Sequence, residues 1–171
     1  MEKGKIKTSK KEIVDYWFSR VDESGLSVDA AEAHERCWRC GCERSLERCH
    51  IIPASLGGED NPSNLVLLCQ RCHLENPNVS DPEIMWDWLR AYGTAFYNTF
   101  WILQGAKEYE FIYHKSLAEE LKVRDINDMG KFNKIVAEEL QNTAFHYGHP
   151  YLNSGTLAGV LRIALKKYKR E

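Results

Sequence analysis

Two pairs of cysteines are the residues of this sequence whose types and spacing point most directly to chemistry. Cys37 and Cys40 form one CxxC pair, and Cys69 and Cys72 form a second. A CxxC turn places two thiolates on one side of a hairpin, so two such turns can surround one ion tetrahedrally at zinc–sulfur distances of roughly 2.3 Å. The protein would then fill every coordination position, and the ion could not activate water. We therefore predict a structural Zn²⁺ at these four cysteines.

The distribution of the remaining cysteines supports a metal site. All six cysteines of the chain fall between residues 37 and 72, and in a reducing compartment such clustering favours metal binding over disulfides. The alternative is that the cysteines are buried without a ligand, but matched CxxC pairs seldom serve only as small apolar residues. Cys42 competes for the ion, because Cys40-x-Cys42 is also a chelating spacing; we regard Cys42 as a spare.

Three further residues could carry catalysis: His50, Asn64 and His73. A neutral imidazole has a pKa close to working pH, which suits the removal of a proton from water. An isolated histidine is more often structural or on the surface than catalytic. Asn64 could simply cap a turn in the NPSN segment. The order of these residues relative to the cysteines therefore has to decide between the two interpretations.

That order resembles the HNH endonuclease family, in its version with two CxxC zinc-binding pairs. The resemblance covers residues 37–76, about a quarter of the 171-residue chain. The residues that carry it, in order, are Cys37, Cys40, His50 with the IIP that follows, Gly57-Gly58, Asn64, the NLVLLC run, Cys72 and His73.

The resemblance implies a DNA endonuclease that hydrolyses phosphodiester bonds with a divalent metal ion. In this family the first histidine, here His50, is the general base, a role that contributes roughly 10²–10⁴-fold to the rate. The asparagine, here Asn64, usually links the long loop to the strand that bears the base and so holds the base in place. The last histidine, here His73, binds the catalytic metal, which contacts the scissile phosphate and the leaving oxygen.

The sequence departs from the family pattern at Cys49, where the residue before the base is usually Asp, His or another hard metal ligand. A thiolate prefers zinc or other soft ions to magnesium. Cys49 could bind the metal and shift its preference toward manganese, nickel or zinc. It could be a non-ligand, which leaves His73, phosphate and water to hold the ion, or the site could be degenerate and inactive. We favour the non-ligand, and the catalytic metal stays open among Mg²⁺, Mn²⁺, Ni²⁺ and Zn²⁺.

The elements that must position these residues can be predicted from local patterns. Residues 8–20 have helical spacing, with Thr8 or Ser9 as cap and Glu12 three residues after Ser9. A short helix from Val28 to Arg36 would be capped by Ser27. LERCHIIP and LVLLC are strand candidates on either side of the loop ASLGGEDNPSN, and QRCHLEN begins a helix that Pro77 ends.

The sequence after Asp81 is predominantly helical. Asp81 caps a helix with Pro82 at its first position. One long helix over 95–121 and two more over 131–147 and 154–168 follow. The expected fold class is α+β and mostly helical, with a small zinc-stabilised ββα-metal core embedded in N- and C-terminal helices. We expect three segments, namely residues 1–33 as an N-terminal helical segment, 34–80 as the HNH core and 81–171 as a C-terminal helical extension.

An aromatic-rich stretch opens this extension. Its apolar residues are Met85, Trp86, Trp88, Leu89, Tyr92, Phe96, Tyr97, Phe100 and Trp101. Aromatic rings bury large areas, so the simplest interpretation is that they pack helices against the core. A surface between two copies of the chain is an alternative, and stacking on unpaired bases is a weaker one because the ring spacing is helical.

Composition and charge set the remaining expectations. The chain has 43% hydrophobic and 28% charged residues, as is usual for a soluble globular protein. It has no run of about 18 apolar residues and no secretory signal, so we expect no membrane association and a cytoplasmic location. The net charge of −2 neither supports nor excludes a nucleic-acid partner. Basic runs occur at Lys3, Lys5, Lys7, Lys10 and Lys11, and at Lys166, Lys167, Lys169 and Arg170.

These basic runs are either solvated chain ends or contacts to phosphate. The resemblance implies DNA as the partner. One active site cuts one strand, so cutting of both strands would suggest a homodimer. The rival function is a non-catalytic, zinc-stabilised module that binds nucleic acid or another protein.

Overall fold

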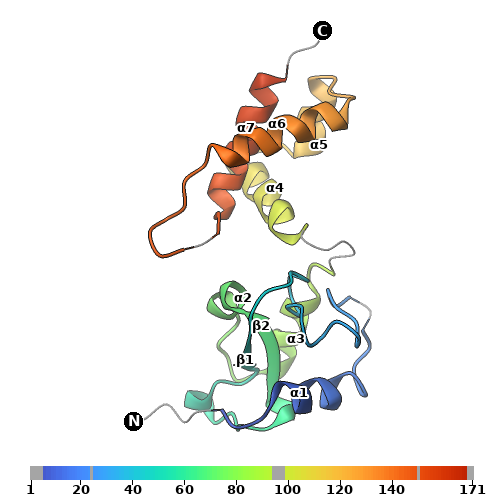
Figure 1. The fold of residues 1–171 in the computed structure, drawn as a ribbon, viewed down its shortest axis with the longest axis vertical. Helices are drawn as coiled ribbons and strands as arrows, with labels where there is room; N and C mark the ends of the chain where they lie inside the picture. Colours follow the sequence, from blue (N-terminus) through green and yellow to red (C-terminus); the bar gives the residue numbers. More distant parts are fainter. Residues whose placement is uncertain (1–5, 24, 94–98, 150, 169–171) are drawn as a thin grey trace. The chain divides into compact units, whose positions relative to one another are not determined.

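The fold is mostly helical, with one two-stranded antiparallel sheet among the described residues, as predicted for the α+β class. This computed structural model describes residues 6–23, 25–93, 99–149 and 151–168. The chain divides into two compact units, residues 1–100 and 101–171 (Figure 1). Each unit is described here by itself.

The first helix of unit 1, α1 (Lys10–Trp17), starts at the predicted cap. The Ser9 hydroxyl accepts from the Glu12 N–H at 3.2 Å, and the Glu12 carboxylate accepts from the Ser9 N–H at 2.7 Å. This reciprocal capping box satisfies N–H groups that have no partner within the helix. The buried residues Ile13 and Val14 face the sheet side, because α1 contacts β2 and the adjoining 3₁₀ turn η2 (Pro62–Asn64).

The helix predicted from Val28 to Arg36 is wrong. Residues 30–35 form successive turns and no α-helix. The Ser27 hydroxyl donates to the carbonyl of Arg39, in the loop of the first cysteine pair, at 2.6 Å. The carboxylate of Asp29 instead accepts from the N–H groups of Ala31 and Glu32 and stabilises a turn.

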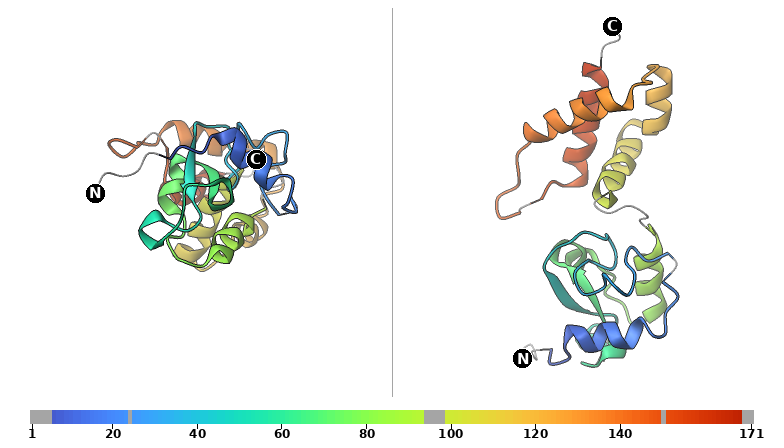
Figure 2. Two further views of the ribbon diagram at one scale, coloured as in Figure 1. Left: turned by 90° about the horizontal axis from the view of Figure 1, so that it is seen from below. Right: turned by 45° about the vertical axis from the view of Figure 1, so that its right-hand side comes forward.

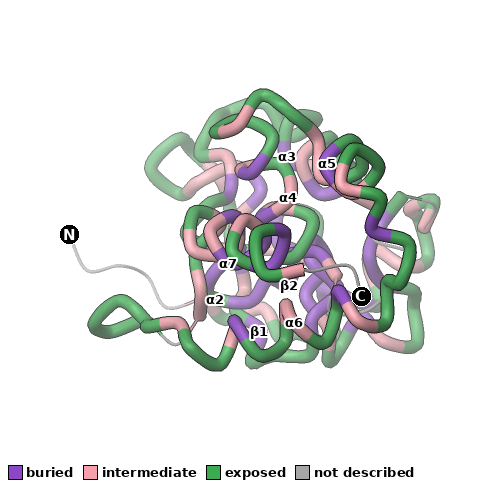
Figure 3. Tube along the Cα trace, turned by 90° about the horizontal axis from the view of Figure 1, so that it is seen from above, coloured by how far each residue is buried: buried purple, intermediate pink, exposed green. Residues whose placement is uncertain are grey.

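The two predicted strands form the hairpin at the centre of unit 1. β1 (Leu46–His50) runs antiparallel to β2 (Leu65–Cys69), with Leu46 opposite Cys69 and His50 opposite Leu65. Every residue of β2 is buried, whereas β1 mixes buried and exposed residues (Figure 3). Helix α2 (Gln70–Glu75) follows β2 directly, so the chain order is ββα (Figure 2). The loop between the strands also contains the 3₁₀ turn η1 (Ala54–Leu56).

Helix α3 (Pro82–Arg90) completes unit 1 and begins as predicted, with the Asp81 carboxylate accepting from the Glu83 N–H at 3.0 Å. Met85 and Leu89 are buried. The Trp86 ring packs edge-on against Trp17 with centroids 4.6 Å apart. These contacts agree with the packing interpretation of the aromatic stretch, of which Phe96 and Tyr97 lie outside the described residues.

Unit 2 contains four helices of the described residues: α4 (Phe100–Tyr113), α5 (Leu117–Val123), α6 (Met129–Gln141) and α7 (Ser154–Lys167). The first residue of α4 still belongs to unit 1. The core residues of unit 2 are Tyr109, Ile126, Phe132, Ala158, Leu161, Ala164 and Leu165. None of the described helices in either unit has the length and apolar character that a membrane span requires.

The prediction of a single helix over 95–121 is wrong in its described part, because the helix is interrupted between α4 and α5. His114 has a positive φ of 54°, which ends α4. Ser116 then starts α5 through a capping box with Glu119. Helix α6 ends at Gln141, with Asn142 as its C-cap, and so stops earlier than the predicted 131–147.

Candidate active site

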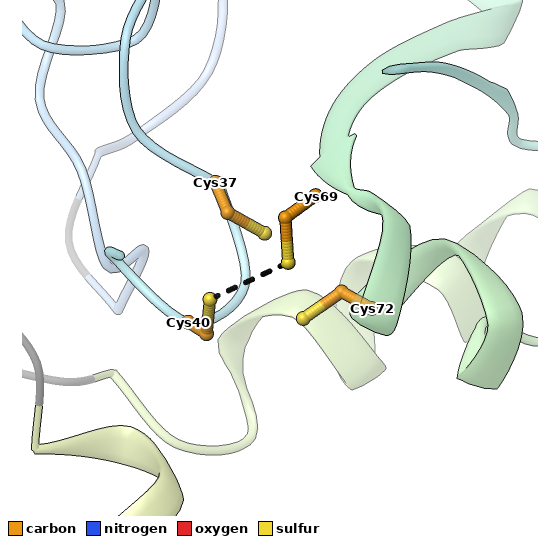
Figure 4. Close-up of side chains that lie close together, drawn as sticks. All are labelled: Cys37, Cys40, Cys69 and Cys72. Atoms are coloured by element: carbon orange, nitrogen blue, oxygen red, sulfur yellow. Dashed lines mark hydrogen bonds between the residues drawn. The ribbon is translucent and has the colours of Figure 1, made fainter. Parts of the chain in front are cut away.

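The four cysteines of the two CxxC pairs come together into one buried cluster. Their sulfur atoms all lie within 4.8 Å of one another. Figure 4 shows one pair on the loop before β1 and the other at the junction of β2 and α2, with the sulfurs of Cys40 and Cys69 3.9 Å apart. A tetrahedral zinc with bonds of roughly 2.3 Å separates its sulfurs by about 3.8 Å. The cluster therefore fits a structural zinc ion.

Cys42 lies outside this cluster, in agreement with its assignment as a spare. Its sulfur is 3.7 Å from the carbonyl oxygen of Cys40. The loop that carries the first pair is held by the Cys37 N–H, which donates to the Cys42 carbonyl at 3.1 Å. The Trp38 N–H donates to the carbonyl of Leu67 at 3.1 Å, which ties the loop to β2. The cysteine pairs are thus brought together by backbone pairing as well as by any bound ion.

Arg39 is a residue that the sequence patterns did not single out. It is 7% exposed, and its Nη1 lies 2.7 Å from a carboxylate oxygen of Glu75 and 4.0 Å from the sulfur of Cys72. Its guanidinium also stacks over the Trp88 ring at 4.0 Å from the centroid. The guanidinium thereby joins the loop of the first cysteine pair to α2, which carries Cys72 and Glu75.

His50 ends β1 and is half-buried. Burial lowers the pKa of its imidazole below the ordinary 6.5, with a further lowering from the nearby His73 and an opposing effect of Asp60. His50 is therefore neutral at neutral pH, as a general base must be. The electrostatic effect of His73 also shows that the two imidazoles share one neighbourhood.

Asn64 connects the loop between the strands to the chain just after His50. Its Oδ1 accepts from the Ile52 N–H at 2.9 Å, and its Nδ2 donates to the carbonyls of Ile52 and Glu59, each at 3.0 Å. Its own carbonyl accepts from the Ile51 N–H at 2.8 Å. One buried side chain thereby closes the loop and restrains the backbone next to the imidazole of His50.

Residue 58 lies so close to the Ile52 carbonyl and to the side chain of Asn64 that the loop requires a glycine there. A Cβ at residue 58 would lie 1.7 Å from the Ile52 carbonyl oxygen and 2.7 Å from Nδ2 of Asn64. Such distances are far below van der Waals contact, so only glycine fits there. The neighbouring Gly57 has a φ of +91° with open space around it, and it supplies the left-handed turn of the loop.

His73 lies in α2 and is half-buried. Its Nδ1 is 2.7 Å from Oε2 of Glu47, a residue of β1 to which the sequence patterns assigned no role. Alternation along a strand places Glu47 and Cys49 on the same face of β1. That spacing, a carboxylate two residues before the expected metal-ligand position, was the signal in the sequence that could have identified Glu47.

Cys49 occupies a different environment from the other candidate ligands. It is 1% exposed, and its sulfur lies 3.6 Å from the carbonyl oxygen of His50. Burial raises the pKa of its thiol to about 12. Within the described residues, the four zinc-site cysteines are the one group of three or more candidate ligands close enough to share an ion, and Cys49 is not among them.

Residues 7 and 8 are held by hydrogen bonds to Asp60 and Arg48. The carboxylate of Asp60 accepts from the Lys7 N–H at 2.6 Å and from the Thr8 N–H at 3.3 Å. Arg48 of β1 donates to the carbonyl of Thr8 at 3.1 Å. Asp60 also influences the pKa of His50, so the backbone of residues 7 and 8 contacts a carboxylate that acts on the candidate base.

Comparison with known proteins agrees with this geometry. Residues 35–78 match the family model described as HNH endonuclease. No curated protein and no solved structure matches the chain. The match spans both cysteine pairs, the two strands and α2, which together form the ββα arrangement. Residues 35–78 are therefore an HNH endonuclease domain, of the type in which two CxxC pairs provide a site for zinc.

Proposed function

We propose that this protein is an endonuclease that hydrolyses DNA phosphodiester bonds with a divalent metal ion and His50 as general base. One observation carries the proposal: a neutral, half-buried His50 is held next to the Asn64-closed loop and near His73, inside an HNH domain. Nothing in a purely structural zinc module requires that combination of residues.

The side chains have distinct tasks in this proposal. His50 removes a proton from the attacking water, because its lowered pKa leaves the imidazole neutral. Asn64 holds the base in position through its three side-chain hydrogen bonds. His73 provides a metal-binding nitrogen on a half-exposed surface that a phosphate can reach.

The donor set around His73 fits a divalent cation. The half-exposed imidazole of His73 suits manganese, nickel or zinc, and water and substrate phosphate supply oxygens that also suit magnesium. When bound, such an ion stabilises negative charge on the phosphate and on the leaving oxygen. Because Cys49 is almost fully buried, we propose that it is not a ligand.

The rival function, a non-catalytic zinc-stabilised binding module, is favoured by one observation. Cys49 stands where a hard ligand is expected in the family, so the chain lacks one donor of the usual set. The two functions differ in a single measurable property, which is whether the protein breaks phosphodiester bonds.

The test is incubation of supercoiled plasmid with zinc-loaded protein and, separately, Mg²⁺, Mn²⁺, Ni²⁺ or added Zn²⁺. We expect relaxed circular DNA with at least one of these ions and none without added metal, because one site cuts one strand at a time. Linear product would indicate that two sites act together, as in a dimer. Binding of DNA without cleavage under every metal condition would support the rival.

A further inference from the structure

Glu47 contacts the expected metal ligand, but the family comparison and the sequence patterns leave it without a role. Its Oε2 lies 2.7 Å from Nδ1 of His73, with side chains 45% and 37% exposed respectively. The contact joins strand β1 to helix α2, and Glu47 of β1 is paired with Leu68 of β2. The partners thus belong to the two elements that build the site.

The geometry of the contact determines which ring nitrogen of His73 remains available. A neutral imidazole carries one N–H and one lone pair, and a carboxylate can only accept a hydrogen bond. The 2.7 Å separation is that of a charge-assisted N–H···O bond. Nδ1 must therefore carry the proton, which leaves the lone pair on Nε2.

This arrangement is the one that metal-binding histidines use. A histidine that binds a metal through one nitrogen almost always donates its other N–H to a carboxylate, a carbonyl or water, which fixes the tautomer and the ring orientation. Among the described residues, the hydrogen bond to Glu47 is the one that His73 makes through its side chain. Nε2 is thus left to bind an ion.

We propose that Glu47 is a positioning residue for the catalytic metal: it accepts the Nδ1–H of His73 and so presents Nε2 to a divalent cation. The proposal rests on the proposed function insofar as the ion serves catalysis, but metal binding and the tautomer can be measured without any cleavage. The contact also compensates for Cys49, because a correctly oriented His73 binds the ion more strongly when the usual neighbouring ligand is missing.

The first experiment measures the tautomer directly. Nitrogen-15 chemical shifts of the His73 ring are recorded in zinc-loaded protein without a second metal, at a pH where the ring is neutral. We expect the protonated-nitrogen shift at Nδ1 in the wild type and its loss in Glu47→Ala. A wild-type ring protonated at Nε2 would overturn the proposal.

The second experiment measures affinity for Mn²⁺ by titration calorimetry of the zinc-loaded protein. We expect Glu47→Ala to weaken binding by about 10–100-fold, the usual effect of removing the group that orients a metal-binding histidine. Glu47→Gln should restore most of the affinity, because its amide oxygen still accepts from Nδ1–H. Glu35→Ala, a change at an exposed glutamate of the same unit, is the matched control and should bind as the wild type does.

Two results would contradict the positioning role. Unchanged Mn²⁺ affinity in Glu47→Ala would show that the contact is an ordinary surface ion pair. If Glu47→Gln bound Mn²⁺ as weakly as Glu47→Ala and both proteins kept the wild-type tautomer of His73, the carboxylate of Glu47 would be shown to bind the ion itself. A wild type that binds Mn²⁺ as expected but cuts no DNA would instead contradict the proposed function and leave this inference intact.

Discussion

At the scale of single residues, the site depends on how burial and neighbouring charges set the protonation of His50. Its pKa is lowered chiefly by burial, with the nearby His73 acting in the same direction and Asp60 opposing it. An imidazole with a lowered pKa is a weaker base, but it is neutral over a wider pH range. The surroundings of His50 therefore keep its imidazole neutral and able to accept a proton at lower pH, although they also make it a weaker base.

This protonation state predicts how cleavage depends on pH. The active form is neutral His50, so the rate should rise as pH increases through the pKa of His50 and then reach a plateau. The midpoint should lie below the ordinary value of 6.5, because the shift is downward. Single-turnover rates between about pH 5 and pH 8 at constant metal occupancy measure it. A midpoint above 6.5 would contradict the assignment of His50 or of its environment.

The sequence was sufficient to identify the residues whose order is diagnostic. The four cysteines form the predicted cluster, and Asn64 makes hydrogen bonds to the segment after His50. Glu47 and Arg39 were missed because their importance arises from contacts between elements. Each pairs with a residue at least 26 positions away, and no local pattern contains that information.

At the scale of elements, the loop between β1 and β2 restrains the backbone next to His50, the proposed base. Asn64 closes this loop through Ile52 and Glu59, and the closure leaves no space for a side chain at residue 58. A small sheet with a long connection has few contacts of its own. Asn64 therefore links the loop to the segment after β1, and a glycine at residue 58 permits the close approach of the two backbones.

The element-scale prediction concerns Gly58→Ala. The added methyl group would overlap the Ile52 carbonyl, so the loop must open and the Asn64 hydrogen bonds must lengthen. We expect a loss of stability of about 1–3 kcal/mol and a lower cleavage rate, measured by urea unfolding and plasmid cleavage.

Gly57→Ala is the matched control within the same loop. Its Cβ meets no atom within 4 Å, but its φ of +91° is unfavourable for alanine. We expect a cost of about 1–2 kcal/mol from backbone strain with the Asn64 contacts retained. If Gly58→Ala were as active and as stable as Gly57→Ala, the closure at Asn64 would not position the base.

Local signals predicted most elements, and the exceptions have physical explanations. Capping residues marked the starts of α1 and α3 correctly, because a cap acts within three residues. The helix expected after Ser27 is replaced by turns, in which the Asp29 carboxylate accepts from the N–H groups of Ala31 and Glu32. The break at His114 was missed because helical spacing of apolar residues continues through it while the backbone φ turns positive.

At the scale of the whole molecule, the chain consists of two units whose cores are built from separate residues. The four zinc-site cysteines all belong to residues 1–100, whereas the core from Tyr109 to Leu165 lies within residues 101–171. Structural zinc in small peptides contributes on the order of 10–16 kcal/mol of apparent binding free energy. Its removal should therefore affect the two units very differently.

Chelation of zinc provides the whole-molecule prediction. Four of the five tryptophans, among them the fully buried Trp38, belong to residues 1–100, so tryptophan fluorescence reports chiefly on unit 1. Most of the described helical residues lie in α4 to α7, so far-ultraviolet circular dichroism reports chiefly on unit 2. We expect a strong chelator to change the fluorescence while most of the helical signal persists. Simultaneous loss of both signals would show that the zinc also supports the second unit.

The central claim is that the HNH domain of this protein cuts DNA with His50 as the base, and the most direct measurement compares His50→Ala with the wild type. Plasmid cleavage rates are measured for both proteins at equal zinc content, with His34→Ala, an exposed histidine of the same unit, as the matched control. We predict a rate roughly 10²–10⁴-fold lower for His50→Ala, an unchanged rate for His34→Ala, and wild-type zinc content and circular dichroism in both. Cleavage by His50→Ala at the wild-type rate would contradict the account.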